Sequence, residues 1–556
     1  MTSRTEICKN CKKEFTIDAE DTAFYERMAV PPPTRCPDCR AIRRLTWWNE
    51  HNLYRNQGMF STYPEHSPIK IYDHDYWWSD GWDAMDYGRD YDFKRPFFDS
   101  PRGEAGQFNE LACAVPRSAR EIKSLEDSDY SDNSSHHLKH CYLCFDSDFN
   151  DNCMYGNFFR SSKDTLDVTN ADHDELCYEI FVVDRSYQCA FSTDLDNCRN
   201  VWFSRNCEDC EHCFGCANLR HKKYCFFNEQ LTKEEYERRV KELNLGSYAA
   251  LQKTKDAVKT HWQKFPYKFM HGTHNTGVTG DYVSHSKDIV ASFETYESQR
   301  VRYSQRIVNH SSEVWDSTSW GDNSELIYET VVCGENNRNV RFCAFCWPAN
   351  RDIEYCIHCH SSANLFGCVG LRKKEYCILN KQYTRDEYEA LIAKIKIQMT
   401  HDKEYGEFFP TSMSPFAYNE TVAMDYFPLT KEEALKRGFT WRDPEAKEFK
   451  ITMTNNQIPD NIKDTNDQIT KEIIECATCK KAYRILDREL EFYQRLGVPL
   501  PRLCHNCRHT ERLKLRNPMR LYDRTCAKCK APITTTYSPE RPEIVYCETC
   551  YQQEIA

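Results

Sequence analysis

The chain has 556 residues, a mean hydropathy of −0.77 and a net charge of −11, so we expect several domains rather than one large core. No apolar run is long enough for a membrane span, and the first residues lack the apolar core of a signal peptide. A cytoplasmic protein is therefore expected, with its 31 cysteines reduced, buried or bound to metal.

The charge is distributed unevenly along the chain. Residues 1–60 carry 10 Lys and Arg against 8 Asp and Glu, and residues 471–556 carry 16 against 11. Residues 61–470 are acidic, with 48 against 66. Mildly basic ends on an acidic body favour terminal modules that contact an anionic partner.

Residues 1–46 have the cysteine spacing of a zinc ribbon. The pairs Cys8-x2-Cys11 and Cys36-x2-Cys39 supply four thiolates for one tetrahedral Zn²⁺. Between the pairs, residues 18–28 predict a short helix or turn that ends before the prolines at 31–33.

The residues around these cysteines resemble the probable treble-clef zinc-ribbon domains of bacteria. The shared features are an aromatic, an acidic pair before Phe-Tyr, a proline turn and several arginines: Phe15, Glu20, Asp21, Phe24, Tyr25, Pro31 to Pro33, Arg35, Arg40, Arg43 and Arg44. The resemblance implies a Cys₄ zinc site in this segment.

Residues 126–228 repeat with a period of 12, after an aromatic and acidic connector at 47–125. The repeated positions are 141, 153, 165, 177, 189, 201, 213 and 225, which hold six Cys, one Thr and one Val. Twelve residues cannot contain two helices and a turn. The period therefore predicts one coil of a β-solenoid per repeat, with cysteine and aromatic ladders.

A second copy follows with more drift. The apolar positions recur at 12 to 14 residues and predict a second solenoid: Ile289, Val301, Val314, Leu326, Val340, Ile353, Leu365 and Cys377. The closing motifs, at 213–236 and 365–388, share a constant offset of 152. In each, a threonine begins a capping box, so we expect helices near 232–243 and 384–396 to cover the solenoid ends.

Two further zinc-ribbon patterns lie at the C-terminal end. Residues 471–515 repeat the first spacing with Cys476, Cys479, Cys504 and Cys507, and residues 516–556 add Cys526, Cys529, Cys547 and Cys550. Basic side chains lie in the first two ribbons and in the segment that directly follows the second ribbon. They predict a nucleic-acid-binding surface. It consists of Arg40, Arg43, Arg44, Arg508, Arg512, Lys514, Arg516 and Arg520.

The run Cys207-x2-Cys210-x2-Cys213-x2-Cys216 permits two interpretations. Four thiols in ten residues are also the spacing of iron–sulfur ligands. The second copy has Ser362 and Leu365 where the first has Cys210 and Cys213, which favours a buried cysteine ladder instead.

Over most of its length the chain resembles uncharacterised, Patescibacteria-type bacterial zinc-ribbon proteins with cysteine-rich repeats, sometimes labelled CaiB/BaiF CoA-transferases. The matching stretches are the two Phe-Gly-Cys…Tyr-Cys motifs, residues 418–423, 426–429 and 458–462, and the terminal ribbons. The resemblance implies zinc binding and this architecture.

The expected fold is mainly β and multidomain, with two solenoids between Cys₄ ribbons. The predicted units are a ribbon (1–46), a connector (47–125), a solenoid with its capping helix (126–245), a linker (246–280), a second solenoid with its helix (281–396), a connector (397–470) and two ribbons (471–515 and 516–556).

The predicted function is a non-enzymatic scaffold with three structural zinc ions, which contacts a macromolecular partner, with RNA or DNA as a candidate. The alternatives are a protein–protein adaptor and an enzyme, either a solenoid carbohydrate enzyme or a CoA-transferase. The sequence contains no Gly-rich phosphate loop and no Gly-x-Ser-x-Gly or His-Glu-x-x-His motif, so no catalytic residue is assigned.

Overall fold

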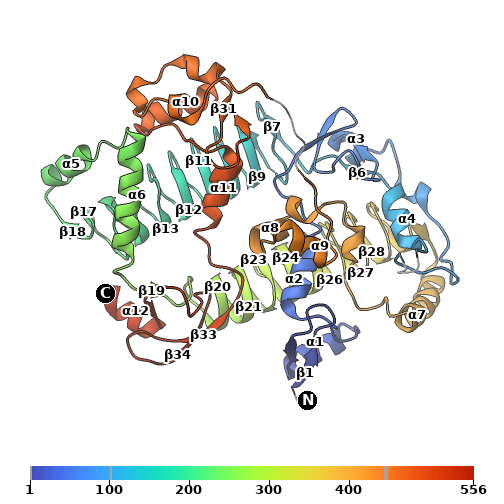
Figure 1. Ribbon diagram of the computed structural model, residues 1–556. Helices are drawn as coiled ribbons and strands as arrows, with labels where there is room; N and C mark the ends of the chain where they lie inside the picture. Colours follow the sequence, from blue (N-terminus) through green and yellow to red (C-terminus); the bar gives the residue numbers. More distant parts are fainter. Residues whose placement is uncertain (1–2, 100–102, 135, 444–448, 556) are drawn as a thin grey trace.

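The computed structural model describes residues 3–99, 103–134, 136–443 and 449–555. Two stacks of parallel strands dominate the structure, and the zinc ribbons and helices lie around them (Figure 1). The mainly β, two-solenoid architecture predicted from the sequence is confirmed. Within the described residues, no helix combines the length and apolar character needed to cross a membrane.

Solenoid 1 is formed by parallel strands whose paired residues are 12 positions apart. Tyr142 pairs with Met154, Met154 with Leu166, and Leu166 with Tyr178. The strands are β9 (Tyr142–Asp148), β10 (Met154–Arg160), β11 (Leu166–Asp172), β12 (Tyr178–Asp184), β13 (Thr193–Asp196), β14 (Arg199–Trp202), β15 (Arg205–Glu208), β16 (Glu211–Phe214) and β17 (Lys223–Phe226).

Each coil of solenoid 1 has four sides of three residues. Every third residue is left-handed, as at Leu143 (φ 52°) and Asp146 (φ 46°). Every third residue also points inward and is buried, as at Cys141, Cys144 and Ser147. Asn and Asp tolerate the left-handed conformation better than other non-glycine residues, which accounts for their abundance between the repeated positions.

The solenoid cysteines occupy these inward positions as small hydrogen-bond donors. Cys141 donates its thiol hydrogen to the carbonyl oxygen of Lys139, two residues earlier, at 3.3 Å. Ser162 occupies an equivalent position and donates to Arg160 at 2.8 Å. The run from Cys207 to Cys216 follows the same three-residue spacing around the coil. Its four sulfurs do not form a metal-sized group among the described residues, so the structure favours the ladder over an iron–sulfur site.

In solenoid 2 the pairing of the first coil shifts from 11 to 12 residues, and the later coils have 12 or 13 residues. In three of the four 13-residue coils the extra residue is inserted at a corner, where two left-handed residues follow each other, as at Asn309-His310 and Asp322-Asn323. Its strands are β20 (Thr276–Ser284), β21 (Lys287–Tyr296), β22 (Gln299–Arg302), β23 (Gln305–Val308), β24 (Ser312–Gly321), β25 (Glu325–Val331), β26 (Arg338–Arg341), β27 (Arg351–Glu354), β28 (Ala363–Phe366) and β29 (Glu375–Ile378).

The predicted register of solenoid 2 is wrong at one position. Val314 pairs with Ile327, and Ile327 pairs with Val340, so that Ile327 occupies the inward ladder. Leu326 is the left-handed corner residue before it (φ 58°). The error arises because sequence periodicity cannot place a one-residue insertion between two adjacent apolar side chains.

Helices cover the C-terminal end of both solenoids, as predicted. In each case a short antiparallel strand, β18 (Glu229–Gln230) or β30 (Lys381–Gln382), leads into the helix, α5 (Lys233–Glu242) or α7 (Arg385–His401). Thr384 and Glu387 form a reciprocal capping box, whereas at α5 Thr232 accepts from the backbone of Glu235. Covering the last coil protects an edge that would otherwise present unpaired backbone groups.

Residues 47–125 pack on solenoid 2 through their aromatic side chains. The Trp77 and His360 rings are 5.5 Å apart, and the Phe97 and Tyr355 rings are also 5.5 Å apart. The elements here are β3 (Tyr54–Asn56), β4 (Met59–Ser61), β5 (Ile71–Tyr72), α3 (His74–Trp78), η1 (Ala84–Tyr87), α4 (Gln107–Ala114), β6 (Arg117–Ser118), β7 (Leu125–Glu126) and, beyond the connector, β8 (Leu138–Lys139).

The remaining segments link the solenoids to the C-terminal ribbons. After solenoid 1 come α6 (Tyr248–Trp262) and β19 (Tyr267–Lys268). After solenoid 2 come η2 (Thr411–Met413), η3 (Tyr418–Glu420), α8 (Val422–Tyr426), α9 (Lys431–Lys436), η4 (Asn455–Gln457), η5 (Ile462–Asp464) and η6 (Asp467–Lys471).

The two solenoids touch each other directly. Arg306 of solenoid 2 lies 3.1 Å from Asp146 of solenoid 1 and 2.7 Å from Glu50 of the connector. Tyr282 of solenoid 2 donates its hydroxyl hydrogen to Asp194 of solenoid 1 at 2.9 Å. The buried guanidinium of Arg306 therefore joins three parts of the chain.

The third ribbon covers the first coil of solenoid 2. Thr536 donates to Asp281 at 2.7 Å, and the other carboxylate oxygen of Asp281 lies 2.9 Å from Nδ1 of His271. Burial lowers the pKa of His271, but the Asp281 carboxylate more than offsets this and raises that pKa to about 9.

This His271–Asp281 pair predicts a pH-dependent stability. Because the pKa rises from 6.5 in the unfolded chain to about 9, its contribution is complete below pH 6.5 and is lost as the pH rises through 9. The loss amounts to at most about 3 kcal/mol. Urea unfolding between pH 6 and pH 10 should show this decline, and His271→Gln should remove it. The exposed His274, changed to Gln, is the matched control and should leave the decline unchanged.

Candidate zinc centres and their docking sites

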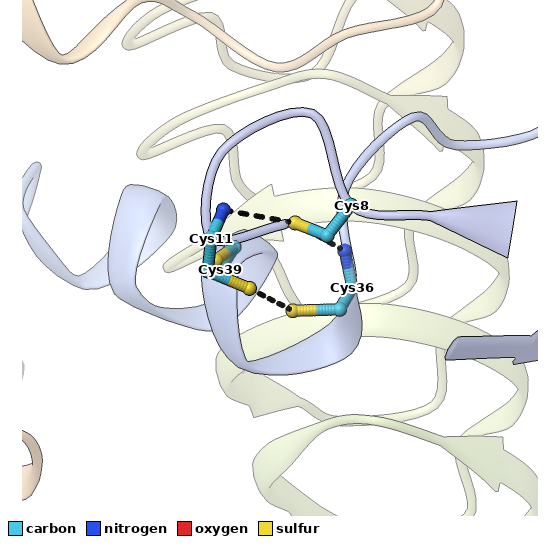
Figure 2. Close-up of side chains that lie close together, drawn as sticks. All are labelled: Cys8, Cys11, Cys36 and Cys39. Atoms are coloured by element: carbon cyan, nitrogen blue, oxygen red, sulfur yellow. Dashed lines mark hydrogen bonds between the residues drawn. The ribbon is translucent and has the colours of Figure 1, made fainter. Parts of the chain in front are cut away.

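The structure gathers the twelve predicted zinc ligands into three groups of four. In each group the Sγ atoms lie within 4.8 Å of one another. Figure 2 shows the first group, in which Cys8 and Cys36 lie on one side and Cys11 and Cys39 on the other. Cys36 and Cys504 are the N-cap residues of α2 (Pro37–Leu45) and α11 (His505–Leu513), so the start of each helix holds the second cysteine pair.

The other elements of the ribbons are short. The first ribbon has β1 (Arg4–Ile7), β2 (Glu14–Ile17) and α1 (Ala19–Arg27), and the second has β31 (Ile474–Glu475), β32 (Ala482–Tyr483) and α10 (Asp487–Leu496). The third has β33 (Tyr522–Thr525), β34 (Pro532–Thr535), β35 (Val545–Tyr546) and α12 (Glu548–Ile555).

The distances between sulfurs fit zinc. Sγ–Sγ separations are 3.6 Å for Cys11–Cys36 and 3.7 Å for both Cys479–Cys504 and Cys529–Cys547. A tetrahedral Zn²⁺ with Zn–S bonds of about 2.3 Å requires sulfurs roughly 3.8 Å apart. The three groups are therefore zinc sites, and four thiolates fill the coordination shell of each ion without an open position.

The first cysteine of each ribbon is prepared for ligation by backbone N–H groups. Burial raises the pKa of Cys526, but N–H donors from its own knuckle and from the second cysteine pair lower it to about 6. The same opposing effects lower the pKa of Cys476 to about 7 and that of Cys8 below its usual value. These N–H groups stabilise the thiolate form that binds the metal.

Comparison with known families supports the first ribbon. Residues 3–46 match the family model described as a probable treble clef domain. This range contains all four cysteines of the first group, so the resemblance predicted from the sequence is confirmed there. The comparison with curated proteins gives no match.

The three arginines of α2 in the first ribbon do not face solvent. Arg40 lies 2.8 Å from Asp316, Arg43 lies 2.6 Å from Glu329, and Arg44 lies 3.2 Å from Asp316. The three guanidiniums and both carboxylates are buried. Through them α2 docks on strands β24 and β25 of solenoid 2.

The second ribbon docks on solenoid 1 in the same way. Arg508 and Arg512 lie 2.8 Å and 2.6 Å from the buried carboxylate of Asp167. The accessory contacts also correspond. Arg512 Nε donates to Thr169 and Nη2 to the Tyr155 carbonyl, while Arg44 Nε donates to Thr318 and Nη2 to the Tyr303 carbonyl.

The docking partners are crossed with respect to the sequence. The N-terminal ribbon lies on solenoid 2, and the ribbon that follows solenoid 2 lies on solenoid 1 (Figure 1). Residues 3–46 and 471–513 therefore each dock on the solenoid that is more distant from them in sequence. This arrangement fixes the ribbons near both ends of the chain to the two solenoids.

The predicted nucleic-acid surface needs correction at five of its eight residues. Arg40, Arg43, Arg44, Arg508 and Arg512 are buried in the docking sites and cannot contact an external phosphate. Of the other three, Lys514 and Arg520 are exposed, and Lys514 pairs with Glu511 at 2.6 Å. Arg516 is half-buried and donates to the Asp425 carbonyl oxygen at 3.0 Å.

Sequence reasoning missed the acidic partners of these arginines. Asp167 and Asp316 each stand two residues before a threonine and one coil after a tyrosine, Tyr155 or Tyr303. This shared Tyr…Asp-x-Thr pattern is the signal that could have found them.

The zinc assignment predicts three zinc ions per chain that thiol reagents can release. A mercurial titrated in the presence of a zinc indicator should liberate three equivalents, because every such ion is held by thiolates. The double variant Cys479→Ser, Cys507→Ser should liberate two. Cys113→Ser, whose thiol lies outside the three groups, is the control and should keep all three.

The crossed docking predicts which ribbon each solenoid substitution releases. Asp316→Asn removes the nearest counter-ion of Arg40 and Arg44, which then keep only the more distant carboxylate of Glu329, and should destabilise docking of the first ribbon by about 3 kcal/mol. Hydrogen exchange should then increase in residues 37–45 and not in 505–513, whereas Asp167→Asn should do the reverse.

The exposed Asp256 provides the control, since Asp256→Asn should alter exchange in neither helix. Faster exchange in the ribbon nearest in sequence to the altered solenoid would contradict the crossed arrangement.

Proposed function

We propose that the protein is a non-enzymatic zinc-binding scaffold that presents its ribbons and solenoid faces to an anionic macromolecule, RNA or DNA. The main support for this proposal is that all three ribbons dock on solenoids. The zinc ions, by folding the ribbons, therefore help to determine the shape of one large surface. The arginines of α2 and α11 are buried in the docking sites, so only the outer faces of the ribbons are available to a partner.

The observation that favours an anionic partner is a lysine at one position in all three ribbons. Lys12, Lys480 and Lys530 directly follow the second cysteine of the first knuckle, and all are exposed. Each is left-handed, with φ of 63°, 62° and 64°. Glycine or asparagine would adopt this conformation with less strain. Because lysine stands there in all three ribbons, we infer that the lysines are kept for function.

Backbone carbonyls hold the ammonium groups of Lys12 and Lys530 on their knuckles, whereas that of Lys480 lies 3.6 Å from a carboxylate oxygen of Glu475. Lys12 Nζ donates to the Lys9 carbonyl at 2.9 Å, and Lys530 Nζ donates to the Ala527 carbonyl at 3.0 Å. An ammonium group fixed on a rigid knuckle loses little entropy when it contacts a phosphate. Lys514 and Arg520 add positive charge beside the second and third ribbons.

Binding of a labelled single-stranded RNA, measured by fluorescence anisotropy at several salt concentrations, tests the proposal. We expect affinity to fall steeply with salt. The triple variant Lys12→Gln, Lys480→Gln, Lys530→Gln should lower the salt slope by about 1 for each phosphate that its lysines no longer neutralise. The zinc content of the variant should be unchanged.

The matched control carries Lys394→Gln, Lys436→Gln and Lys463→Gln, which are exposed lysines outside the ribbons. It should bind like the unaltered protein. If neither RNA nor DNA binds at low ionic strength, or if both triple variants behave alike, the nucleic-acid proposal fails. A protein partner that survives nuclease treatment in a pull-down would then support the adaptor alternative.

A further inference from the structure

A different group of possible metal ligands lies where the two docked halves of the molecule meet. One half is the first ribbon on solenoid 2, and the other is the second ribbon on solenoid 1. His51, Asp425 and His509 have ligand atoms within 4.8 Å of one another. His51 Nδ1 is 3.9 Å from Asp425 Oδ2, and the two imidazole rings are 5.1 Å apart. None of the three was singled out by its sequence pattern.

Three distant segments bring these side chains together. His51 follows the ribbon that docks on solenoid 2, and Asp425 lies on α8 in the connector after that solenoid. His509 lies on α11, between the arginines that dock on solenoid 1. The corresponding residue of the first ribbon is Ala41, so His509 is not part of the duplicated docking pattern.

The two imidazole nitrogens that would bind a metal are buried and otherwise unused. His51 Nδ1 and His509 Nε2 have no hydrogen-bond partner among the described residues. A buried polar atom left in this state costs about 1–3 kcal/mol. Both rings line a pocket against solenoid 1, and the same pocket is lined by Asn157, which is only 4% exposed and whose amide nitrogen also has no partner among the described residues. Three such atoms at one place indicate an additional bound species.

The nearby arginines are already engaged elsewhere. Arg306 pairs with Glu50 at 2.7 Å, and Arg512 pairs with Asp167 at 2.6 Å. Arg516 donates to the main-chain carbonyl of Asp425, not to its carboxylate, and lies 3.5 Å from the centre of the Tyr426 ring. The carboxylate of Asp425 therefore stays available to a cation.

We propose that His51, Asp425 and His509 bind a divalent metal of the first transition row, separate from the three Cys₄ zinc ions. Two imidazoles and one carboxylate suit iron(II), cobalt(II), nickel(II) or zinc, and leave coordination positions free. Because two of the ligands line the pocket, water or a small anionic ligand can occupy these positions from that side. The metal would also join the two crossed halves.

Titration of the zinc-loaded protein with Co²⁺ under anaerobic conditions tests the site. We expect one equivalent to bind with visible ligand-field bands and without thiolate-to-cobalt charge-transfer absorption, which distinguishes it from exchange into a ribbon. His51→Ala and Asp425→Asn should each weaken this binding by about 100-fold or more, because loss of an outer-shell partner alone costs 10–100-fold.

His505→Ala is the matched control, since His505 lines the same pocket but does not belong to the donor group. It should keep the Co²⁺ equivalent. His51 lies outside the ribbons, so its variant should retain the thiol-releasable zinc and report on this site alone. Absence of the additional equivalent in the unaltered protein, or its persistence in both ligand variants, would overturn the proposal. Neither result depends on RNA binding.

Discussion

The buried ion pairs between ribbon arginines and solenoid aspartates are the interactions on which the tertiary structure depends. Burying a guanidinium is costly without a counter-ion, and both docking sites supply one, Asp316 for the first ribbon and Asp167 for the second. The arginines are correctly placed only when the helix that carries them is fixed. Zinc fixes that helix, because its N-cap cysteine is a ligand. Metal binding, ribbon folding and docking are thus one coupled process.

The solenoids satisfy a different constraint. Their coils turn at left-handed residues every three positions, a conformation that most side chains adopt only at a cost of about 1–2 kcal/mol per residue. Parallel strand pairing between coils and the packing of small inward side chains offset that cost. Cysteine suits this interior because it is small, mostly apolar and still able to donate to a carbonyl. The many cysteines of this chain therefore serve two purposes, as metal ligands in the ribbons and as interior donors in the solenoids.

Crossed docking explains how a chain of small units forms one surface. Each ribbon is too small to be stable without its metal, and each solenoid would expose a buried carboxylate if its ribbon were absent. Because the ribbon from each end reaches the solenoid farther along the chain, neither half is complete alone. The cluster of His51, Asp425 and His509 arises at the meeting point of these halves and could not exist in either one.

The sequence by itself determined the local architecture. Cysteine spacing specified the zinc ligands, the period of 12 specified the coils, and the threonine caps specified the covering helices, since each depends on residues close together in the chain. Sequence reasoning failed at Leu326, where a one-residue insertion shifted the register, and at Arg40 and Arg508, whose charge suggested a phosphate partner. Only the tertiary structure decided which aspartate each arginine meets and that His51, Asp425 and His509 come together. Such contacts depend on how completed units pack against one another, and the charge of a side chain does not reveal whether its partner is another molecule or a distant part of the same chain.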